Sequence, residues 1–191
     1  ADRCEMWDIP DGPARAWRGA DGATRLIAGT ERNRVAKGPA LDAVARDCAV
    51  VFEGARSADP GAHDDRAWIA GLHTADGRRV EALVHVEYHG DKHPGRCAAA
   101  VYLACWRNAE VAAVSEDGGA HFTRRGIVAA LPYRYDGQAG RRTGYFNPSN
   151  ILRDGDYLYA FVFAEAYRAQ GRGACLLRRP LGGGPADWRA W

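Results

Sequence analysis

The sequence lacks any apolar run long enough to cross a membrane. Its longest such stretch, AAAVYLACW, covers residues 98–106, whereas a membrane-spanning helix needs roughly 18 or more apolar residues. It also lacks clusters of lysine and arginine interleaved with aromatic residues, and its formal net charge is only +2. We therefore expect this chain to bind neither a membrane nor nucleic acid.

Helix signals are equally scarce. Only residues 38–48, GPALDAVARDC, show the spacing of apolar side chains that is typical of a helix. No Gly-x-Ser-x-Gly motif is present, so catalysis by a serine on a strand-to-helix turn is not expected. With 47% hydrophobic and 26% charged residues, the composition is that of an ordinary folded domain, and the scarcity of helix signals predicts the all-β class.

The five cysteines occur without the CxxC or HxxxH spacing of a zinc site. Cys97 and Cys105 enclose a short loop, and a disulfide there would stabilise the fold by about 2 to 3 kcal/mol. We therefore predict this disulfide and an oxidising location, secreted or periplasmic. The pairing of Cys4, Cys48 and Cys175 stays open, and one of them is left with an external partner or as a free thiol.

Three Asp-Gly pairs, at residues 21–22, 76–77 and 154–155, separate apolar runs. Asp-Gly in this setting is the strongest local signal for a β-hairpin, because glycine adopts positive φ without a Cβ clash. A glutamate follows ten or eleven residues after each aspartate and ends the second strand of each hairpin: Glu31, Glu87 and Glu165.

A loop and a further strand are expected after each glutamate, in residues 47–55 (DCAVVFEGA), 108–124 (NAEVAAVSEDGGAHFTR) and 173–191 (GACLLRRPLGGGPADWRAW). Each unit then has four antiparallel strands, which is the size and order of a β-propeller blade. The sequence predicts an all-β propeller with about three blades, at about residues 11–58, 64–125 and 145–191. Alternating apolar residues along 157–164 predict that neighbouring sheets cover both faces of that strand.

Propellers close with four to eight blades, so three blades predict that the chain is part of a five- or six-bladed propeller. The remaining blades are then expected on another chain or fragment. The chain begins at Ala1 without a basic and then apolar leader, so we expect a processed product.

The stretch SEDGGAHF, Ser115 to Phe122, resembles the Asp-box of sialidase-type propellers, Ser-x-Asp-x-Gly-x-x-aromatic. In that family the box lies in the turn between the third and fourth strands of a blade, where the resemblance implies a structural role. The order of blades and the stretch NPSNI (residues 147–151) also resemble five-bladed glycoside hydrolases of the arabinanase class. Where sialidases carry Arg-Ile-Pro this sequence has DIPDGPAR, so a sialic acid substrate is not implied.

Strand parity places the three glutamates at one end of the propeller, together with acidic residues that enter the first strands of the blades. Clustered carboxylates separate in pKa, as glycoside cleavage requires of an acid and a base. We predict Asp11 as base or nucleophile, Glu87 as general acid and Asp65 as the residue that tunes or positions them. The predicted substrate-binding residues are Asp8, Glu31, Asp64, His85, Tyr88, Asn147 and Glu165, with Tyr88 or Trp7 stacking on a sugar ring.

The predicted function is therefore a secreted carbohydrate-active propeller, a glycoside hydrolase whose partner is a carbohydrate. No cofactor is required, although a rim of carboxylates has the chemistry to bind Ca²⁺. The alternative is a non-catalytic propeller module that binds glycan or protein within a larger assembly. In that case these carboxylates form turns, strand caps and contacts between blades.

Overall fold

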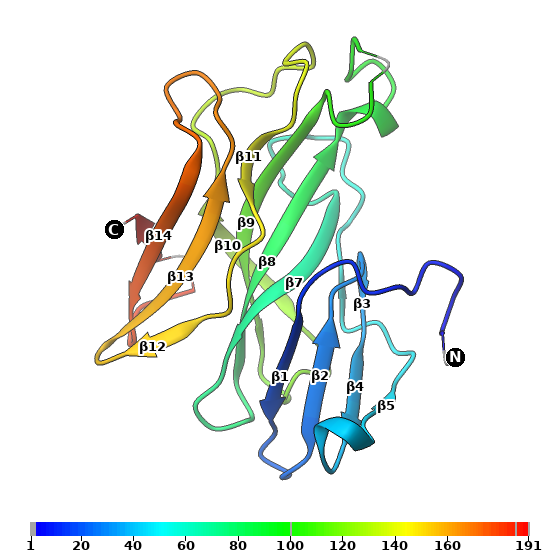
Figure 1. Ribbon diagram of the computed structural model, residues 1–191, viewed down its shortest axis with the longest axis vertical. Helices are drawn as coiled ribbons and strands as arrows, with labels where there is room; N and C mark the ends of the chain where they lie inside the picture. The colour runs from blue at the N-terminus through cyan, green and yellow to red at the C-terminus, as the bar shows by residue number, and fades with distance from the viewer. Residues whose placement is uncertain (1–2, 100, 186, 191) are drawn as a thin grey trace.

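The computed structural model describes residues 3–99, 101–185 and 187–190, and its regular structure is almost entirely β-strand (Figure 1). Within these residues, helical structure is limited to two 3-10 turns, Leu41–Ala43 and Gly90–Lys92. The helix expected in 38–48 is wrong. None of the residues of the turn Leu41–Ala43 is buried, so no apolar face packs against the core to stabilise a helix there.

The first sheet is antiparallel in the order β1 (Ala14–Arg18), β2 (Thr24–Ala28), β4 (Val35–Gly38) and β5 (Ala45–Arg46). The prediction that residues 47–55 form the third strand of this sheet is wrong. In the register of β2 and β4, Val35 is the buried residue opposite Ile27, so β4 takes that place in the sheet. Residues 52–53 form β6 (Phe52–Glu53), which pairs with β3 (Arg32–Asn33) outside this sheet.

The second unit follows the predicted order, with β7 (Arg66–His73), β8 (Val80–His89), β9 (Trp106–Ser115) and β10 (Thr123–Ala129) paired antiparallel. The third contains β11 (Thr143–Phe146), β12 (Leu152–Asp154), β13 (Tyr157–Ala164), β14 (Gly173–Pro180) and β15 (Arg189–Ala190). All three predicted hairpins are confirmed, and Gly22, Gly77 and Gly155 have φ of 76°, 70° and 54°.

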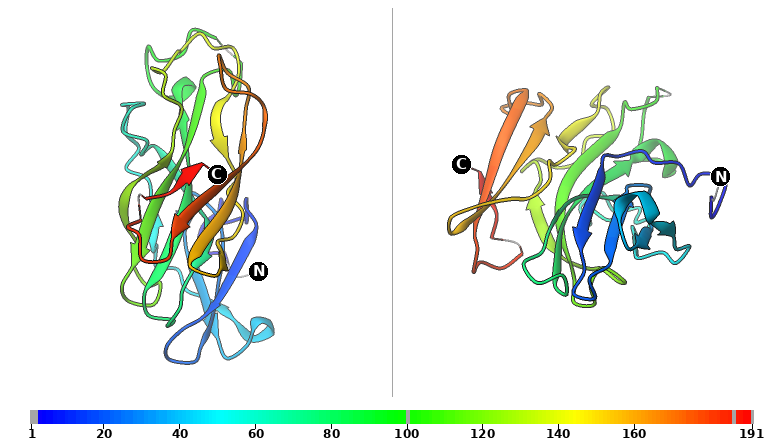
Figure 2. Two further views of the ribbon diagram at one scale, coloured as in Figure 1. Left: turned by 90° about the vertical axis from the view of Figure 1, so that its left-hand side faces the viewer. Right: turned by 60° about the horizontal axis from the view of Figure 1, so that its bottom comes forward.

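The three units lie side by side in chain order, as the right-hand view of Figure 2 shows. Asn150 joins the third unit to the first strand of the second, since its Oδ1 accepts a hydrogen bond from Leu72 N at 2.8 Å. The predicted all-β class is confirmed, and the largely antiparallel units are consistent with a partial β-propeller. The first unit is a four-stranded sheet, whereas the strands of the second and third units are joined in one nine-stranded sheet. One pairing was not predicted, because β11 runs parallel to β9 at Thr143 and Gly144 and so joins the second and third units.

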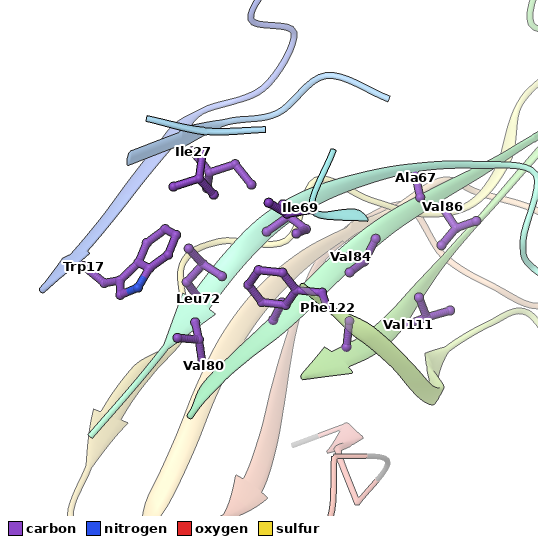
Figure 3. Packing of buried hydrophobic residues seen from close by; sticks show 14 residues of the cluster. Trp17, Ile27, Ala67, Ile69, Leu72, Val80, Val84, Val86, Val111 and Phe122 are labelled. Carbon is purple, nitrogen blue, oxygen red and sulfur yellow. The ribbon is translucent and has the colours of Figure 1, made fainter. Parts of the chain in front are cut away.

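The middle sheet is buried on both faces by its two neighbours. Along β8, Val80, Ala82, Val84 and Val86 pack in one core cluster with Trp17 and Ile27 of the first unit (Figure 3). On the opposite face, Leu83 packs in a second cluster with residues of the third unit, among them Leu158, Val162 and Leu177. Successive side chains of β8 therefore alternate between the two core clusters.

The third sheet differs from this expectation. Leu158, Ala160, Val162 and Ala164 of β13 are buried, but Phe161 on the other face is 49% exposed. The prediction that neighbouring sheets cover both faces of residues 157–164 is therefore wrong for the described residues. That further blades complete the propeller stays a prediction.

The turn between β9 and β10 has the position expected of the Asp-box. Ser115 Oγ lies 2.7 Å from Asp117 Oδ1 and also accepts the backbone N–H of Gly119 at 2.7 Å. Asp117 accepts the N–H of His121 at 3.0 Å, and Phe122 is buried in the first core cluster. The turn is therefore structural, while kinship with sialidases stays a prediction.

The predicted disulfide between Cys97 and Cys105 is confirmed, and a second joins Cys4 to Cys48. Cys175, half-buried on β14, is the free thiol. No helix in the described ranges has the length and apolar content of a membrane span.

Phe122→Ala is expected to lower the free energy of unfolding by about 3 to 5 kcal/mol, because it leaves a cavity between the first two units. The matched control is Phe161→Ala, whose ring is 49% exposed and whose loss should cost less than about 1 kcal/mol. Urea unfolding of both variants measures the difference. Equal losses would contradict the assigned core.

Candidate active site

A cavity of about 370 Å³ lies where the segment before β1 meets the end of β2. The backbone N–H of Asp11 donates to Gly29 O at 2.8 Å, which fixes this segment against the first sheet. The lining residues are Trp7, Ile9, Pro10, Asp11, Thr30, Glu31 and Trp68. Two indole rings and two carboxylates thus share one open hollow. Trp68 was not singled out from the sequence.

Asp11 is the carboxyl group in this hollow whose pKa is raised. Partial burial raises the pKa of Asp11, and the negative charges of Glu87 and Glu31 raise it further, although His85 acts in the opposite direction. The two glutamates end the second strands of the first and second units. The fold therefore brings three predicted site residues from distant parts of the chain within electrostatic reach.

Glu87 has the opposite character. Burial alone would raise its pKa, but hydrogen bonds from His85 and His89 and the charges of these rings lower the pKa of Glu87 to about 2. The Glu87 carboxylate lies 3.1 Å from His85 Nε2 and 2.7 Å from His89 Nε2. Glu87 is therefore ionised at neutral pH. The pKa shifts of Asp11 and Glu87 run opposite to those expected from the roles predicted for them, and the roles themselves stay predictions.

Glu110 is a member of this cluster that sequence reasoning missed. It lies opposite His85 in the register of β8 and β9, is 0% exposed, and its Oε1 is 3.1 Å from His85 Nδ1. Burial raises the pKa of Glu110. Burial alone would lower the pKa of His85, but the charge of Glu110 and its hydrogen bond raise the pKa of His85 above its ordinary value. The available signal was a single glutamate within the otherwise apolar run of 109–114.

Glu31 is held by two arginines. Its carboxylate lies 2.8 Å from Arg66 Nη1 and 2.9 Å from Arg56 Nη2. The hydrogen bond from Arg56 and the charges of both arginines lower the pKa of Glu31 despite partial burial. Glu31 therefore contributes a fixed negative charge beside Asp11.

Glu165 lies directly after β13, in the third unit. It pairs with Arg142 at 2.8 Å and with Arg172 at 3.5 Å. The Arg142 guanidinium lies over Phe146, whose ring is 5.7 Å from the ring of His85. Asn147 follows Phe146 and is exposed, with φ of 48°. Sugar binding by these two predicted residues remains a prediction.

Asp8 does not face the cavity as predicted. It is 3% exposed, forms an ion pair with Arg46 and accepts the N–H of Cys4 at 3.1 Å. Burial alone would raise the pKa of Asp8, but these bonds lower it below its ordinary value. The prediction of a substrate-binding role for Asp8 is wrong, because its carboxylate fastens the first residues to the first sheet.

The structure also separates Asp65 and Tyr88 from the Asp11 cavity. Asp65 is 1% exposed and accepts the N–H of His89 and pairs with His93, both at 3.0 Å. The Tyr88 ring, also 1% exposed, is stacked on His93 at 5.0 Å and contacted by Tyr135 at 4.9 Å. Stacking of Tyr88 on a sugar is therefore wrong. That Asp65 tunes or positions the catalytic pair stays a prediction, since Asp65 bonds the backbone of His89, whose ring contacts Glu87.

Asp64 caps backbone instead of facing the cavity: its Oδ1 accepts the N–H of Ala55 at 3.1 Å. Trp7 is 77% exposed and lines the hollow, where a sugar ring has access to it. Within residues 3–99, 101–185 and 187–190, no group of three His, Cys, Asp or Glu side chains has the geometry to hold a metal ion.

The sequence matches no protein-family model and no curated protein sequence. Solved structures of an alpha-L-arabinanase from Cellvibrio cellulosa overlap with this chain. A structure of a mutant form of that enzyme has a TM-score of 0.42 at 13% identity, with 93% of this chain and 72% of that chain covered. The structure of the unmutated enzyme gives 0.41 at 11% identity, covering 94% and 73%. A complex of that enzyme with arabinohexaose gives 0.39 at 13% identity, covering 89% and 70%. Similarity at this level supports no functional inference.

The low pKa of Glu87 predicts an acid-dependent contribution to stability. Its folded pKa of about 2 lies below the ordinary 4.5, so its contribution is complete above pH 4.5 and is lost as the pH falls toward 2. Glu87→Gln should therefore be less stable than the native chain at pH 6, and the gap should narrow between pH 4.5 and 2.5. Urea unfolding at several pH values measures this gap. A gap that stays constant down to pH 2.5 would contradict the assignment.

Proposed function

We propose that this protein is a carbohydrate-active propeller that cleaves glycosidic bonds with Asp11 and Glu87. The observation that carries the proposal is the coupling of these carboxyl groups beside the 370 Å³ hollow. One of them has a raised and the other a lowered pKa. An unequal pair of this kind is what acid and base catalysis of glycoside cleavage requires.

The directions of the two pKa shifts favour the following roles. Asp11, in its neutral form, donates its proton to the leaving glycosidic oxygen. The ionised Glu87 either removes a proton from the attacking water or attacks the anomeric carbon itself. His85 and His89 keep Glu87 ionised, and Glu110 forms a hydrogen bond with the other ring nitrogen of His85, Nδ1.

Trp7 and Trp68 supply the apolar walls that sugar rings require, since both indole rings line the hollow. Arg56 and Arg66 fix Glu31 as an acceptor for substrate hydroxyls. Two disulfides favour a secreted or periplasmic location, because disulfides persist in oxidising compartments.

Glycan binding without cleavage is the second candidate. It is favoured by the hydrogen bonds that Glu87 already forms with two histidines and by its side-chain exposure of 16%. In that case the Glu87 network is structural, and the two tryptophans carry the binding.

Asp11→Asn and Glu87→Gln are each expected to reduce the rate of glycoside cleavage by about 10² to 10⁴, the range of a general acid or base. Release of reducing ends from a panel of oligosaccharides measures the rate. Thr30→Ser, which keeps a hydroxyl at the cavity wall, serves as the matched control. Unchanged cleavage in both carboxyl variants would refute the hydrolase, whereas glycan binding without cleavage in the native chain would establish the second candidate.

Glu31→Gln tests the assignment of Asp11 as the acid. Removing the Glu31 charge lowers the pKa of Asp11, so the alkaline limb of the rate against pH should move to lower pH. The rate profile of the native chain at the same ionic strength is the reference. A limb that does not move, or moves to higher pH, would contradict the assigned role.

A further inference from the structure

A second cavity, of about 420 Å³, is built by segments that take no part in the hollow around Asp11. Its walls are the loop after β8, the loop after β10 and the loop between β13 and β14, which meet at the upper end of Figure 1. Three of the residues that line it are arginines: Arg96, Arg134 and Arg168.

The three guanidinium groups leave the cavity positively charged. Among the described residues, no carboxylate forms an ion pair with any of the three, whereas Arg142 and Arg172 are paired with Glu165. Asp136 also lines the cavity, but its carboxylate accepts the hydroxyl of Tyr167 at 3.0 Å and the N–H of Gln138 at 2.9 Å. The balance in the cavity is therefore positive, by three cations against one anion.

The loops that carry these arginines are tied together. Ala98 N donates to Gly137 O at 3.0 Å, and the Tyr135 hydroxyl reaches Arg96 O at 2.8 Å and Cys105 O at 3.1 Å. The disulfide between Cys97 and Cys105 closes the first loop. These ties reduce the conformational entropy that a ligand would have to remove on binding.

Arg168 is oriented by aromatic rings. Its guanidinium lies 5.2 Å from the centre of the Tyr133 ring and 5.4 Å from that of Tyr167. Its backbone has φ of 54°, a conformation that costs a residue with a Cβ about 1 kcal/mol or more. The surrounding loops thus hold this cation in place at an energetic cost, as is usual for functional positions.

We propose that this arginine cavity binds the anionic oxygens of an acidic glycan, as a carboxylate or a sulfate ester. The planar guanidinium offers paired N–H donors that match both groups. The cavity is tied to the turn that follows the strand of Glu87, because the Tyr135 hydroxyl lies where a Cβ on Gly90 would be. The identification of the ligand as a glycan rests on the proposed function, and the cavity then selects charged over neutral chains.

The test is calorimetric titration of the native chain at low salt with three probes of equal length. The probes are an oligogalacturonate, a heparin-type sulfated oligosaccharide and neutral arabinohexaose. One of the acidic probes should bind at least about tenfold more tightly than the neutral probe, and added salt should weaken that binding. Whichever acidic probe binds identifies the carboxylate or the sulfate ester as the source of the anion.

Arg134→Gln and Arg168→Gln should each weaken binding of that acidic probe by about tenfold, since each removes one charge-assisted hydrogen-bond donor set. Arg125→Gln, exposed on β10 and outside the cavity, should bind as the native chain does. Arg168→Lys should recover part of the loss, because it keeps the charge. Thermal melts of each variant separate loss of binding from loss of fold.

The inference is overturned if neither acidic probe binds, or if the glutamine variants bind as the native chain does. Failure of the proposed hydrolysis gives a different result. In that case Arg134→Gln still weakens binding of the acidic probe, while Asp11→Asn and Glu87→Gln leave glycan turnover unchanged. Conversely, suppose that Asp11→Asn abolishes turnover while the arginine variants bind the acidic probe as the native chain does. The proposed hydrolase activity would then stand, and the proposed acidic subsite would be rejected.

Discussion

Burial of the middle sheet on both faces is the constraint on which the rest of the structure depends. A strand covered on both sides must be apolar on both sides, and β8 meets this with Val84 toward the first unit and Leu83 toward the third. Near its end the strand replaces apolar groups with His85 and Glu87 on the face of Leu83. These groups are buried between sheets because the same packing continues past the apolar residues.

That burial explains why the charges form a connected group. An isolated ionised side chain between two sheets would cost several kcal/mol. Glu110, His85, Glu87 and His89 instead form an alternating series of acidic and basic side chains, joined by contacts of 3.1, 3.1 and 2.7 Å. Each group compensates its neighbour, and the member at the surface end, Glu87, is left ionised and within electrostatic reach of Asp11.

Local signals in the sequence were sufficient for the hairpins and for much of the strand order. Gly22, Gly77 and Gly155 need positive φ, and Cys97 lies close enough in sequence to Cys105 to pair. The position of Asp8 could not be predicted, because its partners Arg34 and Arg46 lie on another part of the chain. Glu110 was missed for the same reason: its meaning comes from His85 across the β8–β9 ladder.

The opposite pKa shifts of Asp11 and Glu87 follow from the same distinction. Both are carboxylates near strand ends, and nothing local distinguishes an acid from a base. The difference comes from neighbours contributed by tertiary structure, with two histidines around Glu87 and two glutamates acting on Asp11. A site assembled from several blades can therefore set the protonation of each carboxyl group separately. For Glu87 this depends on the buried histidine cluster, so the packing that stabilises the middle sheet also keeps the pKa of Glu87 low.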